Sequence, residues 1–232
     1  MFPAWLHWLA VGMLALGMLC AAAIALDVLR HRQRMAIMNV VWPVTALYAG
    51  ALGLWAYARY GRPVRSGRPR RQAGMSVRIA KSTLHCGSGC TLGDLAAEWL
   101  AFAFPAVATG FGWHRLFEEK IFAVWLLDFL FAFAFGIVFQ YLAIVPMRHL
   151  SFRRGLLAAA KADALSLAAW QVGMYGAMAL LQFGLLRRSF GRVAPVDTPE
   201  FWFAMQLAML AGFVTAYPVN RWLIRRGLKE AM

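Results

Sequence analysis

Residues 4–26 read AWLHWLAVGMLALGMLCAAAIAL, and this stretch decides the class of fold. It contains no Asp, Glu, Lys or Arg. A helix rises about 1.5 Å per residue, so the stretch is long enough to cross the roughly 30 Å hydrocarbon core of a bilayer. Because lipid offers the backbone no hydrogen-bond partner, a segment that crosses it is expected to be helical.

Five further apolar blocks follow in the 232-residue chain, at residues 36–58, 92–113, 121–145, 163–186 and 200–224. The whole chain is 62% hydrophobic, whereas a soluble domain has roughly 45–50% apolar residues. We therefore predict an all-α, polytopic membrane protein with six transmembrane helices. Asp128 and Gln140, which interrupt the fourth block, are expected to form hydrogen bonds between helices.

These blocks divide the chain into three parts. Residues 1–58 are predicted to form an N-terminal transmembrane hairpin, and residues 82–232 a four-helix membrane domain. Residues 59–81, which lie between them, are rich in Gly, Pro and Arg. That composition is typical of a solvated linker.

The basic residues give the predicted orientation in the membrane. The formal net charge is +14, but the basic residues flank apolar blocks, which indicates membrane orientation and excludes nucleic-acid binding. With six spans, 16 of the 24 Lys and Arg fall on one side, in residues 59–81, 148–161 and 221–229. This predicts a bacterial inner-membrane protein with both termini and the linker in the cytoplasm. The cluster Arg30, Arg32 and Arg34 falls on the opposite side and is an exception to the rule.

The most distinctive polar stretch is residues 83–99, TLHCGSGCTLGDLAAEW. It places His85 and two thiols, Cys86 and Cys90, within six residues. The Gly-Ser-Gly between the cysteines would let the backbone bend tightly and direct both thiols at one centre. In the reducing cytoplasm such thiols favour a soft metal ion, copper(I) before zinc. The alternative is that the cysteines only pack in the protein interior.

Two carboxylates extend this stretch into the membrane. Cys90, Asp94 and Glu98 are four residues apart, so they share one face of a helix that begins near Cys90. The face would run about 12 Å inward from the membrane surface. Acidic residues at that depth are costly, and they usually line a polar path or pair with a cation. We expect them to face the interior of the helix bundle, where Asp94 and Glu98 would belong to the metal site and balance charge or relay protons.

Methionine provides a further group of soft ligands. Met178 in the fifth block and Met209 in the sixth are predicted to lie at about the same depth, where they could form an inner metal station. Methionine is also a common gap-filler in apolar packing, and that alternative stays open.

No motif in the chain indicates an enzyme. There is no P-loop, dinucleotide fingerprint, nucleophile elbow or HExxH sequence. Residues 85–94 (HCGSGCTLGD), 161–167 (KADALSL), 217–224 (YPVNRWLI) and 227–232 (GLKEAM) resemble the Domain of Unknown Function 4396 family of membrane proteins. The resemblance covers roughly residues 81–232. It implies a polytopic membrane architecture and no particular activity.

The leading hypothesis is a non-enzymatic membrane protein that binds or transports a soft metal ion. His85, Cys86 and Cys90 would capture the ion, copper(I) before zinc, at the cytoplasmic end of the metal site. Asp94 and Glu98 would balance its charge or relay protons, and Met178 and Met209 would form an inner station. Two alternatives remain: a membrane thiol–redox protein that cycles Cys86 and Cys90, and a structural or assembly subunit. The expected partners are the lipid bilayer, the metal ion and, as an open possibility, further copies of the same chain.

Overall fold

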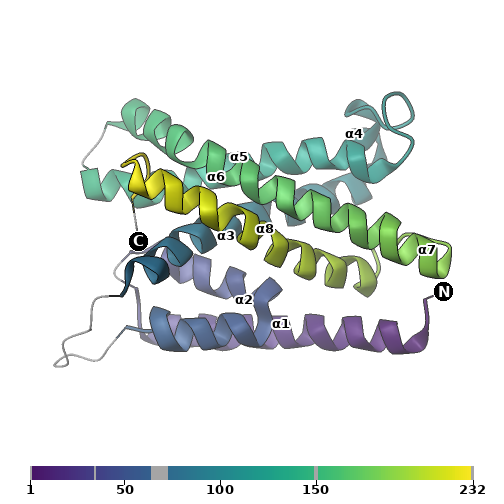
Figure 1. Cartoon of the computed structure of the whole chain (residues 1–232), viewed down its shortest axis with the longest axis horizontal. Helices are drawn as coiled ribbons and strands as arrows, with labels where there is room; N and C mark the ends of the chain where they lie inside the picture. The colour runs from purple at the N-terminus through teal and green to yellow at the C-terminus, as the bar shows by residue number, and fades with distance from the viewer. Residues whose placement is uncertain (1, 34, 64–72, 149–150, 231–232) are drawn as a thin grey trace.

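The protein is a bundle of long helices (Figure 1). The structure is a computed structural model that describes residues 2–33, 35–63, 73–148 and 151–230. Within those ranges it contains an isolated bridge between Trp113 and Phe117 and no strand, so the all-α class is confirmed. The elements are α1 (Ala4–Arg30), α2 (Met38–Ala56), η1 (Tyr57–Gly61), α3 (Met75–Ala103), α4 (Pro105–Gly110), α5 (Lys120–Arg148), α6 (Phe152–Ala179), η2 (Leu180–Leu186), α7 (Arg187–Phe190) and α8 (Pro199–Arg225).

Five helical segments in the described ranges are long and apolar enough to cross a membrane. They are Ala4–Arg30, Met38–Gly61, Lys120–Ala143, Phe152–Phe190 and Pro199–Arg225, which correspond to five of the six predicted blocks. These helices are consistent with a multi-pass membrane protein.

The missing block is 92–113, where the structure differs from the prediction. Helix α3 begins at Met75, inside the predicted linker, and ends at Ala103. Pro105 disfavours a helical conformation at Phe104, whose φ of −127° and ψ of 83° interrupt the helix. Residues 64–72 of the predicted linker lie outside the described residues. Although α3 is too polar to be found by hydropathy, it runs through the middle of the bundle and contacts α2, α5, α6 and α8.

The second block also differs, because α2 turns back on itself at Gly50. This glycine has φ 51° and ψ −128°, which are not helical values. The rings of Trp42 and Tyr57, before and after the turn, are 5.6 Å apart, whereas 15 residues of straight helix would separate them by about 22 Å. The hydroxyl of Tyr57 donates to Asp27 Oδ2 at 2.7 Å, near the point where the chain leaves α1. The segment is therefore a helical hairpin that starts and finishes at the same end of the bundle.

As a result, the two termini lie at opposite ends of the bundle (Figure 1). At one end the ring of Phe2 contacts that of Phe190 at 5.8 Å. At the other end Ser82 Oγ donates to the carbonyl oxygen of Glu230 at 3.1 Å. The sequence prediction places both termini on one side of the membrane, whereas in the described part of the chain α1, α3, α5, α6 and α8 run the length of the bundle and α2 returns to the end where it begins. We call the end with Phe2 and residues 104–119 and 191–198 the loop end, and the opposite end the basic end.

The fold separates the basic residues more sharply than the six-span prediction did. At the loop end lie five of them: Arg115, Lys120, Arg187, Arg188 and Arg192. Every other Lys or Arg in the described part of the chain belongs to segments at the basic end. These include Arg30 and Arg32, members of the cluster that opposed the predicted orientation. They lie at the basic end because α2 turns back at Gly50 and returns to that end.

Small residues bring α3 close to its neighbours. A Cβ on Gly93 would lie 2.4 Å from the backbone nitrogen of Ala132 in α5, and one on Gly87 would lie 2.2 Å from the ring of Trp170 in α6. The Gly-Ser-Gly sequence is therefore part of a regular helix that other helices approach closely, a common arrangement in membrane bundles. It does not form the tight bend that the sequence suggested.

Candidate functional site

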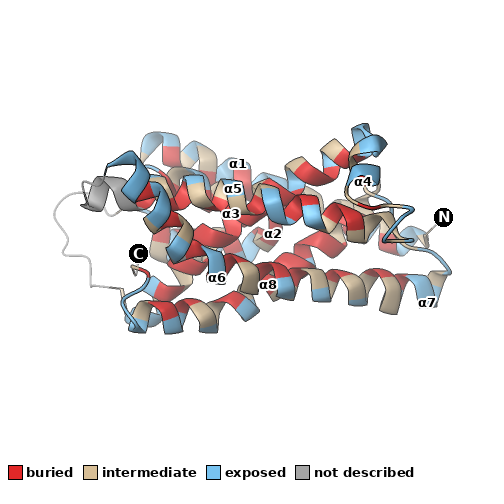
Figure 2. Ribbon diagram, turned by 90° about the horizontal axis from the view of Figure 1, so that it is seen from above, coloured by how far each residue is buried: buried red, intermediate tan, exposed pale blue. Residues whose placement is uncertain are grey.

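A line of polar side chains follows the buried side of α3. His85, Cys86, Cys90 and Asp94 have no exposed surface, and Glu98 is 2% exposed. The prediction that this face is turned into the bundle is confirmed. Its depth is different, because Cys90 lies 15 residues after the start of α3, or about 22 Å along the helix. The thiols are thus in the middle of the bundle and not at its mouth. Figure 2 shows the buried residues along the inner sides of the helices.

The residues predicted to share a metal ion are not gathered around one centre. The His85 ring packs edge-on against Phe139, with centroids 5.9 Å apart. Cys86 and Cys90 are free thiols that belong to a core containing Trp170. Among the residues that the structure describes, no group of three or more His, Cys, Asp or Glu could hold a metal ion. The structure gives no support to the His–Cys–carboxylate cluster.

The predicted methionines are part of the same core. Met178 and Met209 are both buried, and Thr91 Oγ1 lies 3.6 Å from the sulfur of Met209. The sulfur-containing side chains of this core, which we call the sulfur core, are Cys86, Cys90, Met174, Met178, Met205 and Met209. It occupies the middle of the bundle, between the polar groups of the two ends.

At the basic end the polar line finishes in a buried ion pair. Lys229 Nζ donates to Asp163 Oδ1 at 2.9 Å, and neither side chain is more than 1% exposed. Burial lowers the pKa of Lys229, but the negative charge of Asp163 outweighs it and raises that pKa above its ordinary value. The short segment after α8 thus folds back into the bundle. Beside the pair, Asn220 Nδ2 donates to Ser166 Oγ at 2.7 Å.

Towards the loop end, three carboxylates lie near one another in the interior. Asp94 and Glu98 come from α3, and Asp128 comes from α5, which packs against α3; all three side chains are buried. Gln171 Nε2 donates to Asp94 Oδ1 at 2.9 Å. Asp94 Oδ2, Glu98 Oε1 and both oxygens of Asp128 have no hydrogen-bond partner among the described residues. A buried carboxylate without a cationic partner is costly unless it holds a proton or binds a cation.

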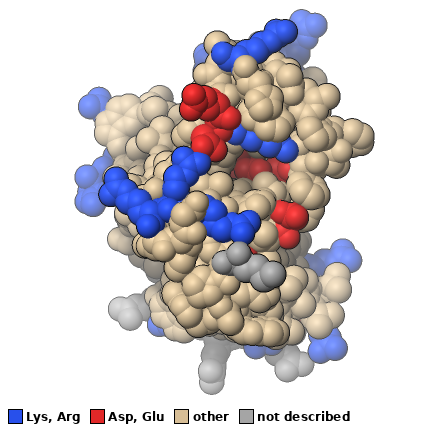
Figure 3. Space-filling model, turned by 90° about the vertical axis from the view of Figure 1, so that its right-hand side faces the viewer, with Lys and Arg blue, Asp and Glu red and all other residues tan. Residues whose placement is uncertain are grey.

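A cavity of about 330 Å³ connects Glu98 with the loop end. Lys120, also on its wall, donates to the carbonyl oxygen of Ala101 at 2.9 Å. The π-helical turn η2 supplies Gln182, whose amide exchanges hydrogen bonds with the backbone of Ala194 at 3.1 and 2.7 Å. These bonds fix residues 191–198 beside the cavity. Figure 3 shows this end of the molecule, with acidic atoms inside a hollow.

Sequence reasoning missed three members of the line. Asp128 was expected to bond between helices, yet its carboxylate has no such partner in the described part of the chain. Its position as a lone charge in an apolar block was a usable signal. No local pattern indicated the pairing of Asp163 with Lys229, because 66 positions separate the two residues.

Comparison with known proteins identifies the family but no activity. No curated protein and no solved structure matches the chain. One family model matches residues 77–229, from the first turn of α3 to Lys229, and leaves α1 and α2 outside. The matched region contains the whole polar line, including Asp94, Glu98, Asp128 and Asp163. The chain belongs to the family described as Domain of unknown function (DUF4396).

Proposed function

We propose that the protein crosses a bacterial inner membrane five times, with α2 as a re-entrant hairpin and the basic end in the cytoplasm. The distribution of Lys and Arg supports this orientation, since basic residues are enriched in cytoplasmic segments. A reporter that is active only in the periplasm, fused after Met232, should be silent. An epitope placed before Phe2 should be accessible to protease from the periplasm. An inaccessible epitope would overturn the five-crossing topology.

We further propose that the polar line transfers protons across the membrane. The observation that carries this proposal is the group of three interior carboxylates, Asp94, Glu98 and Asp128, none of which forms an ion pair within 4 Å in the described part of the chain. Lys120, on the wall of the same cavity as Glu98, is the nearby cation, and its ammonium group donates to the carbonyl oxygen of Ala101. Chains of Asp, Glu and His inside membrane proteins commonly relay protons. Glu98 would exchange protons with the loop-end cavity, and His85 and Asp163 would serve the basic end.

The sulfur core supports gated transfer and opposes an open channel. His85 and Asp94 are nine residues apart, or about 13 Å along α3. Between them lie two thiols and apolar side chains. A proton needs water or a moving side chain to cross such a stretch, so transfer requires a rearrangement of the core.

Proton flux into liposomes tests this proposal. The purified protein would be reconstituted with a pH-sensitive dye inside, and a potassium gradient with valinomycin would drive proton entry. Asp94→Asn and Glu98→Gln should each reduce the flux at least about tenfold, as expected for groups that transfer protons. Glu118→Gln, which changes an exposed carboxylate at the same end, is the matched control. Full flux in the Asp94→Asn/Glu98→Gln double variant, or none above empty liposomes in the parent, contradicts the proposal.

Copper(I) binding is a second candidate, and the sulfur core is the observation that favours it. Thiolates and thioethers are the ligands that copper(I) prefers. Cys86 and Cys90 lie one helical turn apart, and Met178 and Met209 belong to the same core. The site would therefore depend on methionine sulfur, with His85 outside it. Copper(I) bound per chain should fall in Cys86→Ser/Cys90→Ser and stay unchanged in His85→Ala; equal binding by the double variant and the parent would exclude this function.

A further inference from the structure

A second cavity reaches Asp94 from the side of the bundle. It has a volume of about 300 Å³, and α1, α2, α3 and α8 form its walls. Most of its lining is apolar, including Leu14 and Met18 of α1 and Leu95 of α3. Met18 is 59% exposed and Leu95 is 39% exposed, so this side of the bundle would face lipid. The rings of Trp99 and Trp202, also on the wall, stack at 5.9 Å.

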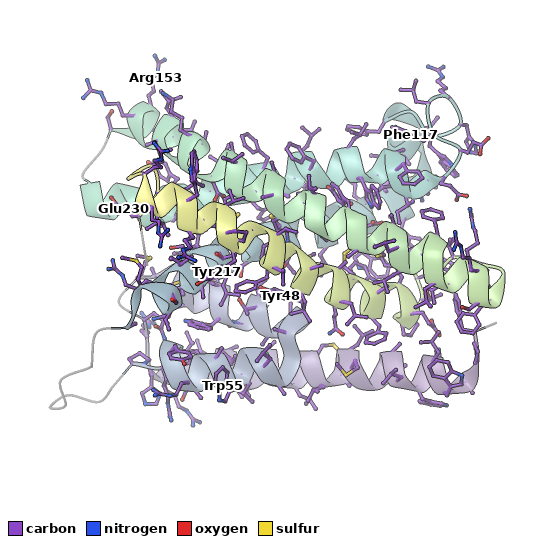
Figure 4. The ribbon with its side chains drawn as sticks, viewed as in Figure 1. Tyr48, Trp55, Phe117, Arg153, Tyr217 and Glu230 are labelled. Carbon is purple, nitrogen blue, oxygen red and sulfur yellow. The ribbon has the colours of Figure 1, made fainter. Side chains whose placement is uncertain are left out.

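Three polar atoms on the wall of this lateral cavity lack partners. They are Asp94 Oδ2, Gln206 Oε1 and Tyr48 Oη, and each side chain is more than nine-tenths buried. Tyr48 lies towards the middle of the bundle, whereas Phe117 and Glu230 lie near opposite ends (Figure 4). Burying three unpartnered polar atoms costs free energy, so their presence in one apolar cavity points to a ligand that satisfies them.

The neighbouring contacts leave these atoms available. Gln171 occupies Asp94 Oδ1 at 2.9 Å, which leaves Oδ2 as the carboxylate's remaining acceptor. Gln206 Nε2 donates to the carbonyl oxygen of Leu47 at 2.7 Å, so its amide is held with Oε1 unused. The residues that the structure describes around the cavity include no Lys or Arg. A ligand can therefore supply both the missing positive charge and the missing donors.

We propose that the lateral cavity binds a lipophilic primary amine as its ammonium ion. The three N–H groups of an ammonium match the three oxygen acceptors, and its charge complements Asp94. The alkyl part would lie among Leu14, Met18 and Leu95, and the stacked tryptophans favour a nearby cation. Such a molecule partitions into the bilayer and would enter from the lipid side.

Amine binding would give the proposed proton path a substrate class. The binding itself does not depend on proton transfer. Asp94 belongs both to the lateral cavity and to the carboxylate group of the polar line. An ammonium ion bound at Asp94 would replace a proton on that carboxylate. Amine binding and proton transfer would then be coupled, provided that the polar line transfers protons. Binding stands on the three polar atoms of the cavity alone.

Binding of tritiated octylamine to the protein in lipid nanodiscs tests the proposal, with empty nanodiscs as the blank. Unlabelled octyltrimethylammonium keeps the charge without N–H donors, and octanol keeps a donor without the charge. Each should compete at least about tenfold more weakly than unlabelled octylamine, because hydrogen bonds to a charged group contribute that much or more. If all three compete equally, the cavity accepts acyl chains without selecting a head group, and the proposal is wrong.

Variants locate the binding site. Asp94→Asn should weaken octylamine binding at least about tenfold. Gln206→Leu should weaken it about threefold or more. Glu118→Gln is the matched control, since this exposed carboxylate is neither on the wall of the cavity nor in the polar line, and it should bind within about twofold of the parent. Leu14→Trp would fill the cavity from α1 without touching the polar line, so it should abolish binding while proton flux continues. Unchanged binding in both Leu14→Trp and Gln206→Leu overturns the inference, whether or not Asp94→Asn folds. Selective binding without flux in the parent would contradict the proton path alone.

Discussion

Helices α1 and α3 are opposites in composition and in burial. Helix α1 is among the most apolar segments of the chain, yet only 28% of its most apolar 18-residue window is buried. Helix α3 carries His, Cys, Asp and Glu, and these side chains are buried. A water-soluble bundle would show the reverse pattern. The difference is consistent with a membrane protein whose apolar helices lie on the outside and whose polar helix α3 lies in the interior.

The largest expected change in stability comes from breaking the buried ion pair between Lys229 and Asp163. Lys229→Met leaves Asp163 as an uncompensated buried charge, and it should lower the free energy of unfolding by about 3–5 kcal/mol. Arg30→Met, which removes an exposed charge at the end of α1, should change it by less than about 0.5 kcal/mol. Thermal unfolding in detergent measures both. The double variant Lys229→Met/Asp163→Leu should regain most of the loss, and no recovery would show that the pair is not isolated.

The pH dependence of this pair has a defined sign. Because the pKa of Lys229 is raised in the folded protein, its contribution to stability is fully present below the unfolded pKa of about 10.4 and is lost as pH rises through the folded value. Titration of Lys229 should therefore not change the stability difference between the parent and Lys229→Met from about pH 7 to pH 9. A difference that shrinks steadily over that range would show that the ammonium is not stabilised by Asp163.

A smaller effect distinguishes the packing of the two helices. Gly93→Ala in α3 forces a methyl group against the backbone of Ala132, at 2.4 Å, and should cost about 1–3 kcal/mol. Gly12→Ala in α1 meets nothing within 4 Å and should be neutral or slightly stabilising. The measurement is the melting temperature of each variant. Equal behaviour would mean that α3 does not pack as closely as its glycines indicate.

Replacing an unpartnered carboxylate should separate stability from function. Asp128→Leu removes a buried group that has no hydrogen-bond partner in the described chain, so stability should rise by about 1–2 kcal/mol while proton flux falls. The opposite change on α1, Leu19→Asp, places a charge on a side chain that is 69% exposed towards lipid. Insertion should then become less favourable by about 3 kcal/mol. Loss of stability in Asp128→Leu would instead indicate a structural role.

The smallest effect is expected for the thiols. Cys86 and Cys90 are fully buried, and Cys20 in α1 is 5% exposed, so none should react with a membrane-permeant maleimide in the folded protein. Leu26→Cys, at a position that is 61% exposed, provides the labelled control. Rapid labelling of Cys86 or Cys90 would show that the core opens, and it would revive the thiol–redox alternative.

The apolar blocks predicted the helices that face lipid, and spacing predicted the buried face of Cys90, Asp94 and Glu98. The apolar blocks did not predict the start of α3, because a stretch rich in Gly, Ser and Thr has low hydropathy even when other helices surround it. They also failed at Gly50, since block length alone cannot distinguish a crossing helix from one that returns. The metal cluster failed because the helix began 15 residues earlier than expected, which moved the thiols from the surface into the core.

The hairpin at Gly50 decides whether the number of membrane crossings before α3 is odd or even. In the proposed topology residues 77–229 contain four crossings, α3, α5, α6 and α8, so this family region would start and finish on the same side of the membrane. Helix α1 adds one crossing, and α2 adds none, which delivers the chain to the basic end before α3 begins. If α2 crossed the membrane completely, the chain would reach the loop end before α3 begins. Helices α3, α5, α6 and α8 would then each cross in the opposite direction. In that topology the turn at Gly50 would determine the orientation of the family region 77–229, although Gly50 lies outside it.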